Sequence, residues 1–132
     1  MSHTQISRDT RIETAVHELL DSRAASRIYV YLLRHQGARS NAIIRGTKLH
    51  PSTVRELLSD LYTQKIITRK KIRTDRIGKN PYQYYAVSPL LLVQRRVKII
   101  ESRLNNILRL SDTTQNTPKV VQITINHPEG AV

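Results

Sequence analysis

Four neighbouring polar residues carry side chains that can contact the edges of DNA bases: Ser52, Thr53, Arg55 and Glu56. An arginine guanidinium can donate two parallel hydrogen bonds to O6 and N7 of guanine, and a hydroxyl group can contact any base. These residues begin a segment in which apolar residues recur at intervals of three and four, namely Val54, Leu57, Leu58 and Leu61. Such spacing predicts a helix with one buried face, so the polar residues are expected on its exposed side.

The stretch Ser40–Gln64 predicts a short helix, a tight turn and that second helix. Ser40 can cap the first helix by accepting a hydrogen bond from an otherwise unpaired amide group. Gly46 and Lys48 are expected to end it, and Pro51 suits the first turn of the next helix. The pattern is typical of a helix-turn-helix whose second helix enters the major groove of DNA. An ordinary pair of helices with a solvated outer face is the alternative interpretation.

The charge of the chain is strongly positive and unevenly distributed. Its 132 residues have a formal net charge of +12, which favours a polyanionic partner. No acidic residue lies between Ser22 and Arg55, and seven basic residues accompany one acidic residue between Lys65 and Lys79. A basic run confined to consecutive elements indicates a binding surface. The residues expected to contact the DNA backbone are Ser40, Asn41, Lys48, Lys70, Lys71, Arg73, Arg76, Lys79 and Asn80.

The flanking segments predict the remaining elements of one domain over residues 9–88. Residues 1–8 are expected to be disordered, and Asp9 or Thr10 to cap a helix that ends near residue 21. Ser22 is expected to cap the next helix, which ends at Gly37 and buries a face of Ile28, Tyr31, Leu32 and His35. The segments 66–73 and 82–87 have the composition of strands, with a loop between them. Three helices followed by a β-hairpin predict an α+β winged helix-turn-helix.

A family resemblance rests on three pieces of the sequence: ASRIYVYLLRHQG, LHPSTVRELLSDLYTQKII and GKNPYQYYAVSP. The segment 24–89 resembles the DNA-binding domain of archaeal TrmB-like regulators, and more loosely MarR-, PadR- and ArsR-type winged helices. The family pattern of the wing and its exit falls on Gly78, Lys79, Pro81, Tyr84, Tyr85, Ala86, Val87 and Pro89. The resemblance implies DNA binding. Larger TrmB relatives carry a sugar-binding domain, for which this chain has no room.

A helix is predicted over residues 89–110, with a coiled-coil seam formed by Leu90, Val93, Val97, Ile100, Leu104 and Ile107. Apolar residues that alternate steps of three and four are typical of a dimerisation helix. The alternative is a terminal helix that packs back on its own domain. Residues 111–132 read as a polar linker followed by a candidate strand over residues 119–126, where apolar and polar residues alternate.

The sequence offers little to support catalysis. It contains no cysteine, and its five histidines are scattered without the spacing of a metal site. No phosphate-binding loop is present, so we expect no enzyme activity, metal or cofactor. No signal peptide or membrane span is apparent, which predicts a cytoplasmic protein.

The sequence therefore favours a homodimeric regulator of transcription that binds double-stranded DNA sequence-specifically. A chromatin or RNA-binding winged helix without sequence preference and a winged-helix scaffold for protein interactions are the alternatives. The operator, the direction of regulation, any small-molecule effector and any contact with the transcription machinery stay open.

Overall fold

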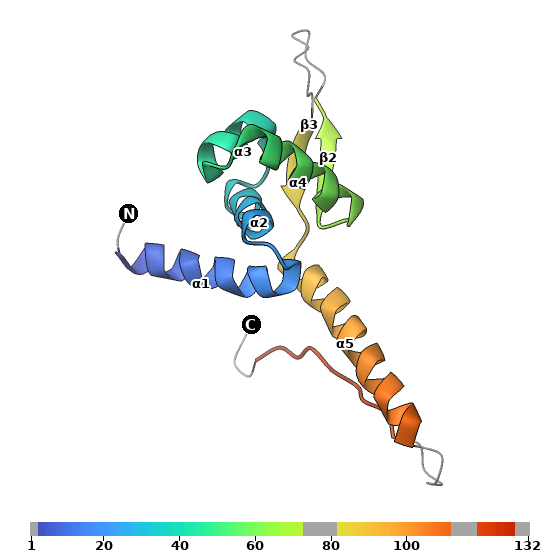
Figure 1. Ribbon diagram of the computed structural model, residues 1–132. Helices are drawn as coiled ribbons and strands as arrows, with labels where there is room; N and C mark the ends of the chain where they lie inside the picture. Colours follow the sequence, from blue (N-terminus) through green and yellow to red (C-terminus); the bar gives the residue numbers. More distant parts are fainter. Residues whose placement is uncertain (1–2, 73–81, 112–118, 129–132) are drawn as a thin grey trace. The chain divides into compact units, whose positions relative to one another are not determined.

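The computed structural model describes residues 3–72, 82–111 and 119–128. The chain divides into two compact units, Met1–Val87 and Ser88–Val132, which we call the N-terminal and the C-terminal unit. The described ranges form five helices and one three-stranded antiparallel sheet, so the fold is α+β as predicted (Figure 1). None of the helices in these ranges is long and apolar enough to cross a membrane.

The first helix, α1, spans His3–Leu20 and packs against α2. It begins before the cap predicted at Asp9 or Thr10, and residues 3–8, expected to be disordered, are part of it. Aspartate and threonine cost only a few tenths of a kcal/mol inside a helix relative to alanine, so a residue that suits a cap does not by itself start one.

Helix α2, Arg23–His35, supplies the centre of the core in the N-terminal unit. The prediction that Ser22 caps this helix is confirmed, because the Ala25 amide donates to Ser22 Oγ at 3.1 Å. Its buried face is formed by Ala25, Ser26, Ile28, Tyr29, Val30 and Leu32. The predicted face was therefore rotated: Tyr31 is half-buried and His35 is exposed, and their rings stack with centroids 3.9 Å apart. Rings with polar atoms favour this boundary position.

The Tyr29 side chain connects α2 to the segment that follows the sheet. Its hydroxyl group donates to the Val87 carbonyl at 2.6 Å, and the residue is fully buried. Burial disfavours the charged phenolate and raises the pKa of Tyr29 to about 12. The core of the unit thus contains one phenol whose polar atom is satisfied by the backbone.

The sheet consists of β1 (Ala38–Arg39), β2 (Ile67–Lys71) and β3 (Tyr82–Ala86), in the order β1-β3-β2. Strands β2 and β3 pair in antiparallel register from Ile67 opposite Ala86 to Lys71 opposite Tyr82. The predicted hairpin is present, with strands shorter than the ranges 66–73 and 82–87. Strand β1 was not predicted, because two residues are too few to show a periodic pattern.

The helix-turn-helix consists of α3 (Ser40–Thr47) and α4 (Pro51–Thr63). Figure 1 shows α3, α4 and the β2–β3 hairpin on one side of the N-terminal unit. Their apolar side chains meet those of α2, and the buried residues include Ile43, Val54, Leu58, Leu61, Ile67 and Tyr84. The order α2, β1, α3, α4, β2 and β3 is that of a winged helix, with α1 in front of it.

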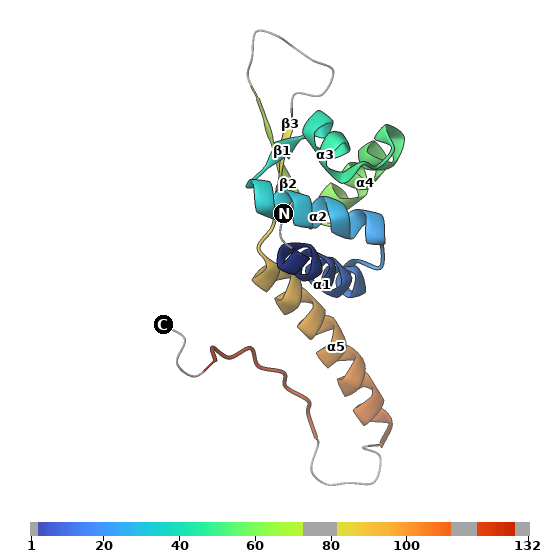
Figure 2. The same ribbon diagram turned by 90° about the vertical axis from the view of Figure 1, so that its left-hand side faces the viewer.

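In the C-terminal unit, the helix predicted over residues 89–110 is α5, Pro89–Ser111. The Leu91 amide donates to Ser88 Oγ at 3.2 Å, so a serine caps its first turn. Residues 119–128 run beside α5 without forming a strand (Figure 2). The candidate strand over residues 119–126 is therefore wrong for this structure, because α5 side chains bind the tail backbone that a sheet edge was expected to pair.

Candidate nucleic-acid interface

The turn between α3 and α4 is built from Thr47 and Lys48. Thr47 is buried, and its hydroxyl donates to the Ile43 carbonyl at 2.6 Å. Lys48 has φ 59°, a left-handed conformation, and its amide donates to the Ile44 carbonyl at 3.0 Å. The left-handed residue redirects the chain into α4, while the Lys48 side chain stays exposed. Lys48 was predicted both to help close α3 and to contact phosphate, and the turn is compatible with both roles.

The start of α4 depends on His50, which sequence reasoning did not select. His50 is the N-cap residue, and its Nδ1 accepts a hydrogen bond from the Ser52 amide at 3.2 Å. The Ser52 hydroxyl lies 2.7 Å from the same nitrogen. Because Nδ1 accepts the amide hydrogen, the hydroxyl donates to it as well and keeps its oxygen as an acceptor. Histidine is an uncommon cap, and its position before Pro51 was the only signal in the sequence.

The exposed side of α4 carries most of the predicted base-reading residues. Ser52, Arg55 and Glu56 are exposed, whereas Thr53 is half-buried. On the opposite side, Val54 is 0% and Leu58 is 2% exposed. The structure thus brings three of the four predicted residues together on one solvent-facing surface, and Thr53 lies at its border.

The start of α3 differs from the prediction. The N-cap residue is Arg39, which makes no side-chain cap hydrogen bond, so the expectation that Ser40 caps α3 is wrong. Ser40 is the first residue of the helix and is buried, whereas Asn41 is exposed. The short strand β1 ends at Arg39 and moves the helix start one residue forward in space and register. Of the two predicted phosphate contacts, only Asn41 lies open to solvent.

The hairpin carries the remaining predicted contacts. Lys70 and Lys71 are exposed on β2. Arg73, Arg76, Lys79 and Asn80 lie outside the described residues. The exposed bases of the N-terminal unit also include Arg27, Arg34, Arg39, Arg45 and Lys65. Among the residues that the structure describes, no group of three or more histidine or acidic side chains could hold a metal ion.

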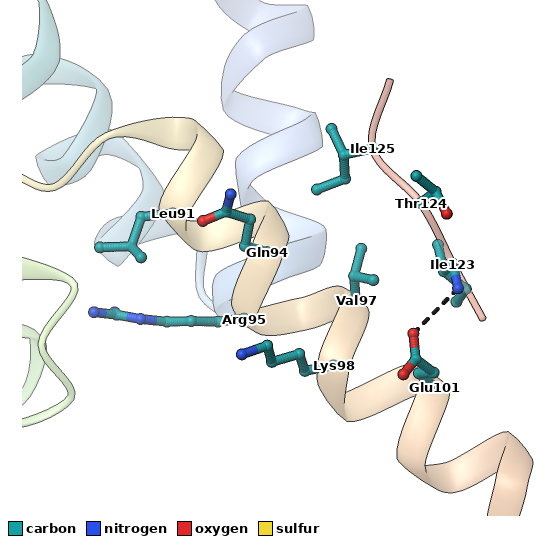
Figure 3. Close-up of a pocket in the computed structure, with 9 residues that line it drawn as sticks. All are labelled: Leu91, Gln94, Arg95, Val97, Lys98, Glu101, Ile123, Thr124 and Ile125. Atoms are coloured by element: carbon teal, nitrogen blue, oxygen red, sulfur yellow. Dashed lines mark hydrogen bonds between the residues drawn. The ribbon is translucent and has the colours of Figure 1, made fainter. Parts of the chain in front are cut away.

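A separate hollow lies within the C-terminal unit, between α5 and the tail. It has a volume of about 570 Å³ and is lined by Leu91, Gln94, Arg95, Val97, Lys98, Glu101, Ile123, Thr124 and Ile125 (Figure 3). Figure 3 shows Glu101 directed at the tail, where its carboxylate accepts the Ile123 amide at 3.1 Å. The tail is thus anchored by polar contacts on one side of a partly apolar hollow.

The comparisons with known proteins bear on the fold. The sequence matches no protein-family model and no curated protein. One solved structure similar to this chain is a possible transcriptional regulator from Methanosarcina mazei Go1. The two chains are 21% identical and superpose with a TM-score of 0.62, over 77% of this chain and 89% of the other. The similarity supports the fold of a regulator without singling out the TrmB-like group.

Proposed function

We propose that this protein is a sequence-specific, double-stranded DNA-binding regulator of transcription that acts as a homodimer. The observation that carries the proposal is the exposed polar surface of α4, formed by Ser52, Arg55 and Glu56 opposite a fully buried apolar face. A helix held in this way is rigid on its inner side and free to enter a major groove on its outer side. The name of the structurally similar regulator is consistent with this role.

Arg55 is the proposed base-reading residue of this surface. It is exposed in the first half of α4, where recognition helices contact base edges. Its planar guanidinium matches the O6 and N7 acceptors of guanine. Ser52 and Glu56 contact neighbouring bases, and half-buried Thr53 contacts the wall of the groove.

The proposed backbone contacts surround α4. Asn41 and Lys48 bind phosphates on the side of α3, and Lys70 and Lys71 bind them on the side of β2; all four side chains are exposed. Arg73, Arg76, Lys79 and Asn80 extend this set in the wing. Buried Ser40 is no longer included. Such contacts position the protein, whereas base contacts specify the site.

The homodimer is proposed to form through α5. Of the six seam residues, Leu90 is 53%, Val93 38%, Ile100 37%, Leu104 40% and Ile107 63% exposed in the single chain, and Val97 is half-buried. An apolar row of this length is stabilised when a second copy covers it. Two copies would present two α4 helices, so the preferred DNA site should be a repeated half-site.

Selection of binding sites from random duplex DNA tests the proposal. We expect an enriched motif with two related half-sites, bound much more tightly than a scrambled duplex of equal length. Equal affinity for all duplexes would indicate a nucleic-acid-binding protein without sequence preference. Absence of binding to any duplex at low salt would reject the proposed function and favour an interaction scaffold.

A further inference from the structure

The guanidinium of Arg69 lies between two tyrosine rings. Its central carbon is 4.0 Å from the centroid of the Tyr62 ring and 4.2 Å from that of the Tyr82 ring. Arg69 is on β2, Tyr82 begins β3, and Tyr62 belongs to the last turn of α4. The arrangement joins the end of the helix-turn-helix to the base of the hairpin.

This stack leaves the donors of Arg69 available in one plane. Aromatic rings cover a guanidinium from above and below, whereas its five N–H groups point outward in the plane. Across residues 3–72, 82–111 and 119–128, the contacts of Arg69 are those with the two rings. A half-buried, permanently charged group with unused donors is suited to an anion brought by a ligand.

The position of Tyr62 relates this group to the proposed DNA surface. Ser52, Arg55, Ser59 and Tyr62 are spaced by three, four and three residues along α4. At 3.6 residues per turn these positions fall within about 80° of one another around the helix axis. Tyr62 is 40% exposed, so the exposed row that begins at the base-reading residues ends at the ring that holds Arg69.

The charge near Arg69 indicates the class of ligand. Lys65, Lys70 and Lys71 are exposed in the same part of the chain. A planar fork beside several ammonium groups matches a phosphodiester, whose two free oxygens accept parallel hydrogen bonds. A carboxylate has a similar shape, but the surrounding positive charge fits a polyanionic strand better.

We propose that Arg69 is a phosphate-binding residue that grips the DNA backbone beside the groove entered by α4, with Tyr62 and Tyr82 as its positioning residues. The inference rests on the proposed function and adds to it a contact that the sequence pattern did not select. Because the rings hold the guanidinium in one orientation before DNA arrives, little side-chain freedom is lost on binding.

Salt-dependent binding to a preferred and a scrambled duplex tests the site. Arg69→Gln removes one phosphate contact, so the slope of log K against log salt should fall by about 0.9 on both duplexes. Arg69→Lys keeps the charge but loses the fork, so affinity should fall about ten-fold with little change in slope. Arg11→Gln on α1, also exposed, is the matched charge control and should leave the slope unchanged.

Two variants of Tyr62 separate positioning from folding. Tyr62→Phe keeps the ring and should bind as the wild type does, whereas Tyr62→Leu removes one half of the stack and should bind both duplexes more weakly. Melting curves show which variants are folded, and the Tyr62 pair decides the case if Arg69→Gln melts early. A wild-type slope for folded Arg69→Gln, or equal loss in both Tyr62 variants, would overturn the Arg69 site. Failure of the wild type to bind any duplex would instead reject the proposed function.

Discussion

The side chain of Asn105 forms two hydrogen bonds with the backbone of Val121. The Val121 amide donates to Asn105 Oδ1 at 2.7 Å, and Asn105 Nδ2 donates to the Val121 carbonyl at 3.3 Å. Glu101, one turn earlier on α5, accepts the Ile123 amide. A helix thereby satisfies two alternate residues of an extended segment, in the way that a neighbouring strand would.

We therefore expect Asn105→Ala to release the tail from α5. The substitution removes both bonds to Val121, so hydrogen exchange at the Val121 and Ile123 amides should become faster. Asn105→Asp keeps the acceptor and loses the donor, and it should have an intermediate effect. Asn106→Ala, an exposed neighbour, is the control. Unchanged protection in Asn105→Ala would mean that the tail is held by other contacts.

The dimer seam predicts a change of mass. The double substitution Val97→Glu and Ile100→Glu places four charges in a symmetric seam, where their desolvation is unfavourable. Light scattering should show a dimer for the wild type and a monomer for this variant. Ser102→Glu adds a charge at an exposed position of α5 outside the seam and should leave the dimer intact. A dimer that survives the double substitution would place the interface elsewhere.

Base reading by Arg55 predicts a loss that depends on DNA sequence. Arg55→Ala should cost about 1–3 kcal/mol on the preferred duplex and relax discrimination at one position per half-site. Lys70→Ala, which removes a proposed phosphate contact, should weaken all duplexes by a similar factor and reduce the salt slope by about one. Titrations of both variants on preferred and scrambled duplexes check this. Equal losses on both duplexes for Arg55→Ala would make Arg55 a phosphate contact.

The cap at His50 predicts an effect on stability. His50→Ala leaves the Ser52 amide without its side-chain partner and should lower the free energy of unfolding by about 0.5–2 kcal/mol. Asparagine is a favourable cap residue, so His50→Asn should restore most of the loss. Urea unfolding of the three proteins measures both changes. If the asparagine variant is no more stable than the alanine variant, the role of His50 is not that of a cap.

The buried phenol of Tyr29 predicts a dependence of stability on alkaline pH. Its pKa is about 12 in the folded chain and about 10 for an ordinary tyrosine. The unfolded chain therefore releases this proton first, so the contribution of Tyr29 is complete below pH 10 and is lost as pH rises toward 12. The shift corresponds to about 2–3 kcal/mol.

Tyr29→Phe isolates this contribution from those of the other titrating groups. The variant should be less stable at neutral pH, because the Val87 carbonyl loses its donor. Its stability should also fall less than that of the wild type between pH 10 and 12. Parallel curves for the two proteins would show that Tyr29 does not carry the pH dependence.

Local periodicity was enough to determine the principal elements from the sequence. The apolar spacing of Val54, Leu58 and Leu61 predicts α4 and its buried face, and that face is buried in the structure. The Ser22 cap and the helix from residue 89 also follow from short-range signals. These features depend on neighbours within one or two turns, so the order of residues alone determines them.

Contacts between distant segments were decided only by the tertiary structure. Strand β1 exists because Ala38 and Arg39 pair with Tyr84 and Gln83, and two residues carry no period of their own. The tail alternates like a strand, yet Asn105 binds it in place of a sheet edge. Likewise, Arg69 appeared as one of several basic residues until the fold brought Tyr62 and Tyr82 to its two faces. Each depends on side chains far apart in the sequence, whose meeting depends on how the elements pack.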